Sequence, residues 1–236
     1  MQKIVNKVRC IHRHTIDEHP GCFAQGIVSD TRESKLIPWF KEEDLKIAIL
    51  DIEATGLKPE WGIMLTWCIR EKGGEVIYTD VVTKEDLFNG TLDKRIIESL
   101  VTQLQKYKVV IGYYSNGYDL PYVRAKALHY DIPFPGYKLE EKKHGGTKYT
   151  PIMCSWDLYP VVKYKLNLSR NSLDNVCDYL GIPGKTPISK EVWRRAAYGD
   201  AESIAQVLEH NIADCEITDK LHDKLYLFNK WGRNSI

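Results

Sequence analysis

The segment KIAILDIEATGL (residues 46–57) decides how the rest of the chain is interpreted. Its first half is an apolar run that predicts a buried strand. Asp51 and Glu53 end that run, and a Thr-Gly break at Thr55 and Gly56 follows. Side chains two residues apart in a strand point to the same face, so the two carboxylates are expected side by side. Like charges that close raise each other's pKa unless a cation lies between them.

An Asp-x-Glu triplet has an alternative interpretation, a strand end with two ordinary solvent-facing acids. The apolar run before the triplet and the turn after it instead favour a central strand. Such a strand typically delivers a functional site at its carboxyl end.

Composition limits the class of protein. The chain has 236 residues, 43% of them hydrophobic, which fits one medium domain with a small appendage. Lys plus Arg (33) nearly balances Asp plus Glu (32), so a polyanionic partner must meet a local basic patch. No stretch has the apolar length of a membrane span or the apolar block of a signal peptide, which predicts a cytoplasmic protein without membrane contact. Its six cysteines are then expected to be reduced or metal-bound.

The pattern of apolar residues predicts a mixed α/β sheet with helices on both faces. Residues 1–40 are rich in Cys, His and charge and form a separate small segment, whereas residues 41–236 form the main domain. The expected strands are residues 46–52, 63–70, 75–82, 108–113 and 152–157, and the expected helices are residues 93–106, 119–130, 172–180 and 201–226.

Two further acids lie where a site at this sheet edge would need them. Asp119 follows the strand KVVIGY (residues 108–113) and opens a predicted helix. Asp214 lies in the last helix, four residues after His210, so both side chains project from one helix face. The alternative for each acid is a helix cap or a surface charge, and it is strongest for Asp119, which precedes Leu-Pro.

Three motifs in this order resemble the DEDD exonucleases of the ribonuclease H-like superfamily, which include the proofreading exonuclease domain of family B polymerases and a stand-alone branch in archaea and phages. The motifs are DIEATGL (51–57), GYYSNGYDLPYV (112–123) and EHNIADCEIT (209–218). The resemblance covers about residues 46–226. It implies a ribonuclease H-like mixed five-stranded sheet, and it implies a 3′–5′ exonuclease that hydrolyses single-stranded DNA or RNA.

The resemblance also implies a metal site. Asp51, Glu53, Asp119 and Asp214 match the family's ligands for two Mg²⁺ or Mn²⁺ ions, which are hard cations that prefer carboxylate oxygens. Two such ions activate water and stabilise the leaving oxygen of a phosphodiester. His210 occupies a position where one subfamily has Tyr, and we expect it to orient or deprotonate the attacking water.

Substrate contacts are expected around these motifs. Tyr114 replaces an Asn that many family members carry, and it leaves open whether activity is altered. Lys163 and Lys165 alternate with Tyr164 and favour phosphate contacts, although an ordinary solvated edge is the alternative. The full set of predicted substrate-binding residues is Thr55, Gly56, Leu57, Tyr114, Tyr118, Lys163 and Lys165.

The N-terminal stretch CIHRHTIDEHPGC (residues 10–22) predicts a zinc knuckle. A tetrahedral Zn²⁺ needs four ligands, and Cys10, His14, His19 and Cys22 supply them, with His12 as a rival to His14. The alternative is a polar His-rich tail.

Two other functions stay open on the sequence. One is a ribonuclease H-like nucleic-acid-binding module whose catalysis has decayed, and the presence of all four acids argues against it. The other is a structure-selective endonuclease on the same scaffold.

Overall fold

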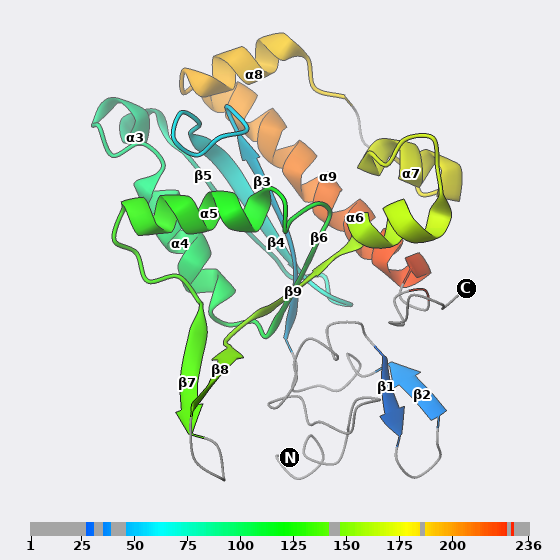
Figure 1. The fold of residues 1–236 in the computed structure, drawn as a ribbon. Coiled ribbons are helices and arrows are strands. Elements are labelled where there is room, and N and C mark those ends of the chain that lie inside the picture. Colours follow the sequence, from blue (N-terminus) through cyan, green and yellow to red (C-terminus); the bar gives the residue numbers. More distant parts are fainter. Residues whose placement is uncertain are drawn as a thin grey trace.

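The computed structural model describes residues 27–30, 35–38, 46–141, 147–184, 187–225 and 228. A five-stranded sheet in the order β5-β4-β3-β6-β9 forms its centre (Figure 1). The strands are β3 (Ile47–Ala54), β4 (Met64–Glu71), β5 (Ile77–Val81), β6 (Val109–Gly112) and β9 (Cys154–Asp157). Two separate two-stranded ladders join β1 (Ile27–Asp30) to β2 (Lys35–Pro38) and β7 (Tyr137–Glu141) to β8 (Thr147–Pro151).

Strand direction explains why residues far apart in the sequence meet. Strand β4 runs antiparallel to both β3 and β5, whereas β3, β6 and β9 run parallel to one another. The carboxyl ends of β3, β6 and β9 therefore lie at one edge of the sheet. That edge carries the acids of the first motif, the turn that precedes Asp119, and Asp157 at the end of β9.

Helices cover both faces of the sheet, as the sequence predicted. They are α3 (Lys84–Phe88), α4 (Lys94–Leu104), α5 (Asp119–His129), α6 (Leu158–Val161), the π-helix η1 (Val162–Leu166), α7 (Leu173–Leu180), α8 (Lys190–Ala197) and α9 (Ala201–Leu225). Figure 1 shows α4 and α5 on one side, and α6, α7 and the long α9 on the other. The short helices α3, α6 and α8 and the β7–β8 hairpin were not expected from the sequence.

Each face has its own apolar core, and alternation along β3 feeds both. Ile47 and Ile49 pack with Leu221 of α9, whereas Leu50 and Ile52 pack with Leu100 of α4. Asp51 and Glu53 share the parity of Ile47 and Ile49, so they point toward α9. The strand thus buries its apolar residues and presents its acids to one helix.

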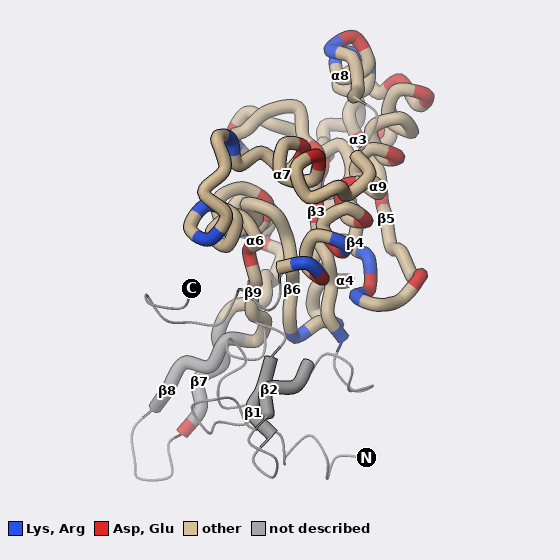
Figure 2. The backbone as a smooth tube through the Cα atoms, turned by 90° about the vertical axis from the view of Figure 1, so that its right-hand side faces the viewer, with Lys and Arg blue, Asp and Glu red and all other residues tan. Residues whose placement is uncertain are grey.

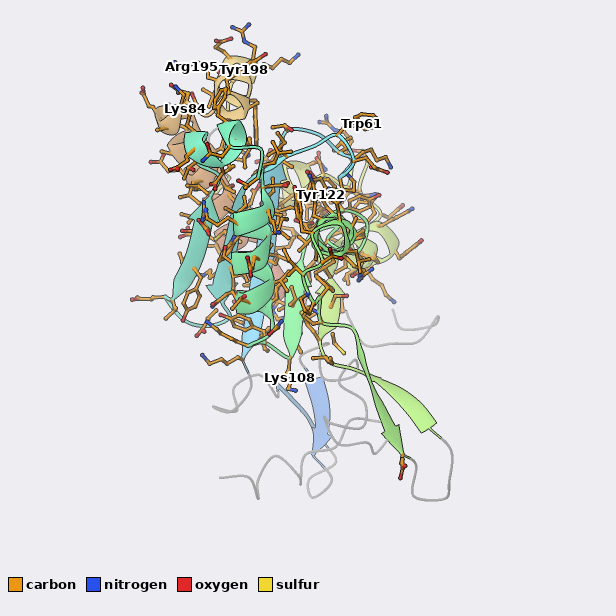
Figure 3. All side chains as sticks on the ribbon, turned by 90° about the vertical axis from the view of Figure 1, so that its left-hand side faces the viewer. Trp61, Lys84, Lys108, Tyr122, Arg195 and Tyr198 are labelled. Atoms are coloured by element: carbon orange, nitrogen blue, oxygen red, sulfur yellow. The ribbon has the colours of Figure 1, made fainter. Side chains whose placement is uncertain are left out.

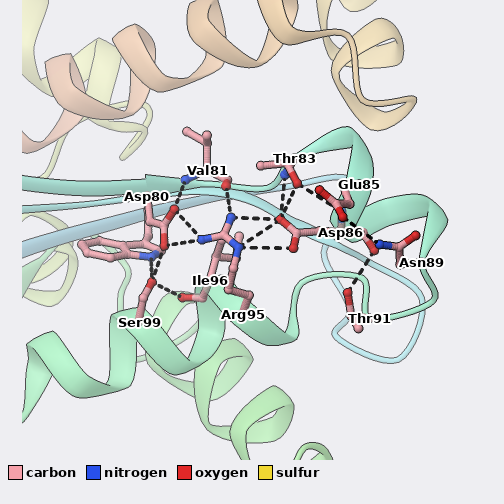
Figure 4. A network of polar contacts seen from close by, with 11 residues as sticks. Asp80, Val81, Thr83, Glu85, Asp86, Asn89, Thr91, Arg95, Ile96 and Ser99 are labelled. Carbon is pink, nitrogen blue, oxygen red and sulfur yellow. Dashed lines mark hydrogen bonds and ion pairs between the residues drawn. The ribbon is translucent and has the colours of Figure 1, made fainter.

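The outer edge of the sheet is fixed by an ion-pair network around Arg95 of α4 (Figure 4). The Arg95 guanidinium donates to the carboxylates of Asp80 and Asp86 and, at 2.6 Å, to the Val81 carbonyl. The Thr83 side chain caps α3 and shares Asp86 with Arg95 in a capping box. One arginine therefore bridges both of these acids.

Candidate active site

The first motif brings both of its acids to α9. Asp51 Oδ2 accepts a hydrogen bond of 2.6 Å from Asn211 Nδ2. Glu53 Oε1 lies 4.0 Å from His210 Nε2. Residues Asn211 and His210 are neighbours on α9, so the strand pair Asp51 and Glu53 lies against one stretch of that helix.

The third motif completes a compact group of potential ligands. His210 Nε2 lies 3.9 Å from Asp214 Oδ2, one helical turn away. One ligand atom each from Glu53, His210 and Asp214 falls within 4.8 Å of the others, a separation that a single metal ion can bridge. The spacing of four residues on α9 is what aims His210 and Asp214 at the same point.

Asp119 approaches from the opposite side of β3. It is the first residue of α5, and its Oδ1 accepts a 3.1 Å hydrogen bond from the Ile52 N–H. Its carboxylate is therefore hydrogen-bonded to β3, the strand that carries the first motif. A helix cap, the alternative considered from the sequence, does not account for this contact. Burial raises the pKa of Asp119 to about 7; the Ile52 hydrogen bond opposes that shift, and the charges of Asp157 and Asp214 add to it. A buried acid among other acids is one that a bound cation would stabilise.

Sequence reasoning missed three residues that shape the site. Asn211 and Thr66 are fully buried, and the Thr66 hydroxyl donates to Asn211 Oδ1 at 3.1 Å. Asp157 accepts from the backbone N–H groups of Tyr114 (2.7 Å) and Asn116 (3.0 Å), which fixes the turn before Asp119. The position of Asp157 at the end of a predicted strand could have pointed to it from the sequence. The Thr66–Asn211 contact could not be predicted in this way, because the two residues are 145 positions apart.

Hydrogen bonds hold the loop that begins at Thr55, within the first motif, in place beside the site. Thr55 bonds Ile63 twice, through its N–H to the Ile63 carbonyl and through its hydroxyl from the Ile63 N–H, both at 2.9 Å. The Tyr118 hydroxyl donates to the Gly56 carbonyl at 3.4 Å, which links the loop to the second motif. Leu57 is 79% exposed on this loop.

Trp61, which was not among the predicted substrate contacts, is 89% exposed on the same loop. Figure 3 shows it at the periphery of the molecule. Gly62 follows it in a tight position, because a Cβ there would lie 2.7 Å from the Tyr122 hydroxyl and 2.9 Å from the Gly56 carbonyl. The loop therefore holds its largest apolar side chain in water on a fixed backbone.

Tyr114 adopts a left-handed backbone conformation (φ 59°) that costs energy for a residue with a Cβ. Its half-exposed ring lies against Gly117, where a Cβ would come within 2.5 Å of it, and edge-on to Tyr159 at 5.0 Å. The replacement of the family's usual Asn by Tyr114 thus places an aromatic ring at the surface beside the turn that leads to Asp119.

The predicted basic residues lie further along the same edge. Lys163 and Lys165 are exposed on η1, and Lys163 Nζ lies 5.5 Å from the centre of the Tyr164 ring. Helix α6, which begins directly after Asp157, connects them to the end of β9. Figure 2 shows Lys and Arg positions, coloured blue, beside α6. The zinc ligands predicted at Cys10, His14, His19 and Cys22, with the rival His12, lie outside the described residues.

A family model for RNase_H_2, described as RNase_H superfamily, matches residues 48–226. The chain belongs to the ribonuclease H superfamily. This match and the five-stranded sheet confirm the fold expected from the sequence. Within the described residues no helix is long and apolar enough to cross a membrane.

Similar proteins include archaeal polymerases. The chain is 28% identical over 161 residues to a DNA polymerase of Methanocaldococcus jannaschii, which covers 64% of this chain and 9% of that protein. It is 24% identical over 242 residues to a DNA polymerase of Thermococcus gorgonarius, covering 91% of this chain and 30% of that protein. A family B DNA polymerase structure from Pyrobaculum calidifontis shares the fold at a TM-score of 0.58 and 21% identity, over 77% of this chain and 24% of that one. The chain spans less than a third of each relative's length.

Proposed function

We propose that this chain is a metal-dependent 3′–5′ exonuclease that hydrolyses phosphodiester bonds of single-stranded DNA or RNA. The observation that carries the proposal is the convergence of Glu53, His210 and Asp214 within 4.8 Å, beside Asp51, in a ribonuclease H superfamily fold. Asp119 is tied to the same strand by its hydrogen bond to Ile52.

The donor set fits two Mg²⁺ or Mn²⁺ ions, because every acid in it offers hard oxygen ligands. Asp51 would bridge the ions, Glu53 and Asp214 would complete one site, and Asp119 would serve the second. The ions supply activation of water and stabilisation of the leaving oxygen. His210 accepts the proton of the attacking water at Nε2, the atom that faces Glu53 and Asp214.

The surroundings of the acids suit a single strand. Leu57 and Trp61 expose apolar surface on a locked loop after Glu53, and bases without a partner strand can stack on such side chains. Tyr114 adds an exposed ring before Asp119, and Lys163 and Lys165 offer charge to phosphates. Thr55, Gly56 and Tyr118 support this surface through the hydrogen bonds that fix the loop.

The test is digestion of a 5′-labelled single-stranded oligonucleotide with Mg²⁺ or Mn²⁺. The proposal expects a ladder that shortens from the 3′ end, and EDTA should abolish it. No cleavage despite binding would favour the decayed binding module, and a single internal cut in a structured substrate would favour the endonuclease. DNA and RNA versions of one sequence would establish the sugar preference.

We also propose that residues 1–40 form a zinc knuckle separate from the exonuclease domain of residues 41–236. Cys10, His14, His19 and Cys22 would hold one Zn²⁺ and leave His12 outside the site. Purified protein that never met a chelator should then contain about one Zn²⁺ per chain. Metal analysis that finds none would reject the knuckle without affecting the proposed exonuclease.

A further inference from the structure

Asn211 is a polar side chain in an unusual place for a helix that packs on a sheet. Its relative exposure is 0%, and so is that of Thr66 on β4, its partner across the interface. Burying an amide costs free energy unless its hydrogen bonds are made, and here one bond goes to Thr66 and one to Asp51. The chain therefore places an amide between α9 and the sheet at the point where the first-motif acid lies.

The two hydrogen bonds fix which way the amide points. Asn211 Oδ1 can only accept, and the Thr66 hydroxyl donates its proton to it at 3.1 Å. Asn211 Nδ2 then faces Asp51 Oδ2 at 2.6 Å, where a carboxylate needs a donor. The flipped amide would set two oxygen acceptors against each other at Asp51. The Asp51 carboxylate thus selects this orientation, and the Thr66 hydroxyl supplies the donor that Asn211 Oδ1 then needs.

One oxygen of Asp51 is occupied by this bond, which determines the direction of the other. While Asn211 holds Oδ2, the carboxylate of Asp51 cannot rotate freely about its Cβ–Cγ bond, so Oδ1 keeps one orientation. Asn211 also sits between His210 and Asp214 on α9, so the same contact keeps the helix residues in register with β3.

We propose that Asn211 is a positioning residue that aims Oδ1 of Asp51 at the metal, and that Thr66 acts through Asn211. The inference rests on the proposed function for its metal, but it concerns residues outside the family's acid set. Groups that orient a metal ligand typically contribute 10–100-fold to metal affinity. We therefore expect the effect first in cation binding and only then in turnover.

The experiment measures Mn²⁺ binding to the full chain by the loss of the free-ion EPR signal, together with turnover. Asn211→Ala should weaken Mn²⁺ binding by about tenfold or more, and excess Mn²⁺ should restore much of the turnover. Thr66→Val, which keeps the shape and removes the hydroxyl, should weaken binding less. Thr66→Ser should restore near wild-type affinity, and adding Thr66→Val to Asn211→Ala should cause no further loss of affinity.

A matched control removes a partly buried hydrogen bond elsewhere. Tyr130 donates to Asp93 at 2.6 Å on the other face of the sheet, so Tyr130→Phe should lower the melting temperature without changing Mn²⁺ affinity. If Asn211→Ala and Thr66→Val behave like Tyr130→Phe, the positioning role is wrong and Asn211 only joins helix to sheet. Thr66→Val decides the matter if Asn211→Ala does not fold.

Failure of the proposed function gives a different result. Wild-type protein that binds Mn²⁺ but cleaves no oligonucleotide would reject the exonuclease, while the Mn²⁺ affinities would still test Asn211. Wild-type protein that binds no Mn²⁺ would overturn both.

Discussion

Two buried aspartates in this molecule have opposite surroundings. Asp86 lies at the edge of the sheet against the Arg95 guanidinium (Figure 4). Although burial raises the pKa of its carboxyl, hydrogen bonds from Arg95 and Thr83 bring that pKa below its ordinary value. Asp119 lies at the carboxyl end of the parallel strands, where burial and the charges of Asp157 and Asp214 raise its pKa to about 7.

The difference distinguishes an acid that stabilises the fold from one that costs it stability. The ion pair of Asp86 compensates for the lost hydration of its charge. At Asp119 burial disfavours the ionised form, and the fold tolerates this because the rest of the structure determines its position. A divalent cation would reverse the disadvantage, which is why the acids around Asp119 point to a metal site.

The largest expected effect is at Asp51. Asp51→Ala should lower turnover by roughly 10³-fold or more, because losing a ligand removes several kcal/mol of charge stabilisation. Folding should survive because the relief of crowding between like charges offsets the loss of the hydrogen bond from Asn211. Steady-state kinetics and thermal unfolding would be measured on the same sample, with Asp86→Asn as the control that should keep its turnover. Near wild-type activity in Asp51→Ala would remove it from the site.

His210→Ala should lower turnover by about 10²–10⁴-fold, the typical range for a lost general base. Wild-type turnover should fall as pH drops and the imidazole gains a proton, and the variant should lose most of that dependence. Mn²⁺ affinity should change little. A parallel loss of Mn²⁺ binding would make His210 a ligand instead, and a variant with unchanged turnover and pH profile would leave it only a packing role near Trp193, whose ring centre lies 6.4 Å away.

Asp119→Asn and Asp86→Asn should change stability in opposite directions in EDTA at pH 8. A raised folded-state pKa means that Asp119 favours the folded protein at low pH and loses that contribution as pH rises from about 4 to about 7. Asp119→Asn should therefore raise the melting temperature at pH 8 and do so much less at pH 5. The lowered pKa of Asp86 gives a contribution present above pH about 4, so Asp86→Asn should cost about 1–2 kcal/mol at pH 8.

Thermal unfolding at the two pH values, with and without Mn²⁺, checks this pair. Mn²⁺ should stabilise the wild type more than Asp119→Asn, because a cation that binds the folded state adds more stability the more tightly it binds. Two variants that shift the melting temperature in the same direction at pH 8 would contradict the comparison.

The smallest expected effect is at Trp61, which lies outside both acid groups. Trp61→Ala should raise KM for a single-stranded oligonucleotide about fivefold, since stacking on one base contributes ~1–3 kcal/mol. The same substitution should leave the hydrolysis of a small phosphodiester, which has no base to stack, unchanged. Tyr179→Ala is the control, because Tyr179 is equally a surface aromatic but lies on α7. Equal increases of KM in both variants would show that Trp61 contributes no more to substrate binding than Tyr179 does.

The fold could be predicted from the sequence where the periodicity of apolar residues was clear. The apolar run before Asp51, and the helical spacing of Ile204, Val207 and Leu221, each match an observed element. The five expected strands correspond to β3, β4, β5, β6 and β9. Helix α8 was missed because its eight residues are fewer than the roughly 11–18 over which a helical period is judged.

The site was predictable only in part. Spacing placed Asp51 beside Glu53 and His210 above Asp214, since those relations are local to one strand or one helix. The contact of Asn211 with Thr66 depends on how α9 packs on β4, and that of Asp119 with Ile52 depends on how α5 meets β3, and no local pattern encodes either arrangement. The strained backbone of Tyr114 likewise appears only in three dimensions.

The most direct measurement is anomalous diffraction from crystals of the full chain soaked in Mn²⁺. The account predicts a strong peak within coordination distance of Asp51, Glu53 and Asp214, and a second peak toward Asp119 when a nucleotide or oligonucleotide is bound. The Arg95 network with Asp80 and Asp86 should show none. Saturating Mn²⁺ with no peak at the first group of acids would contradict the claim that they form a metal site.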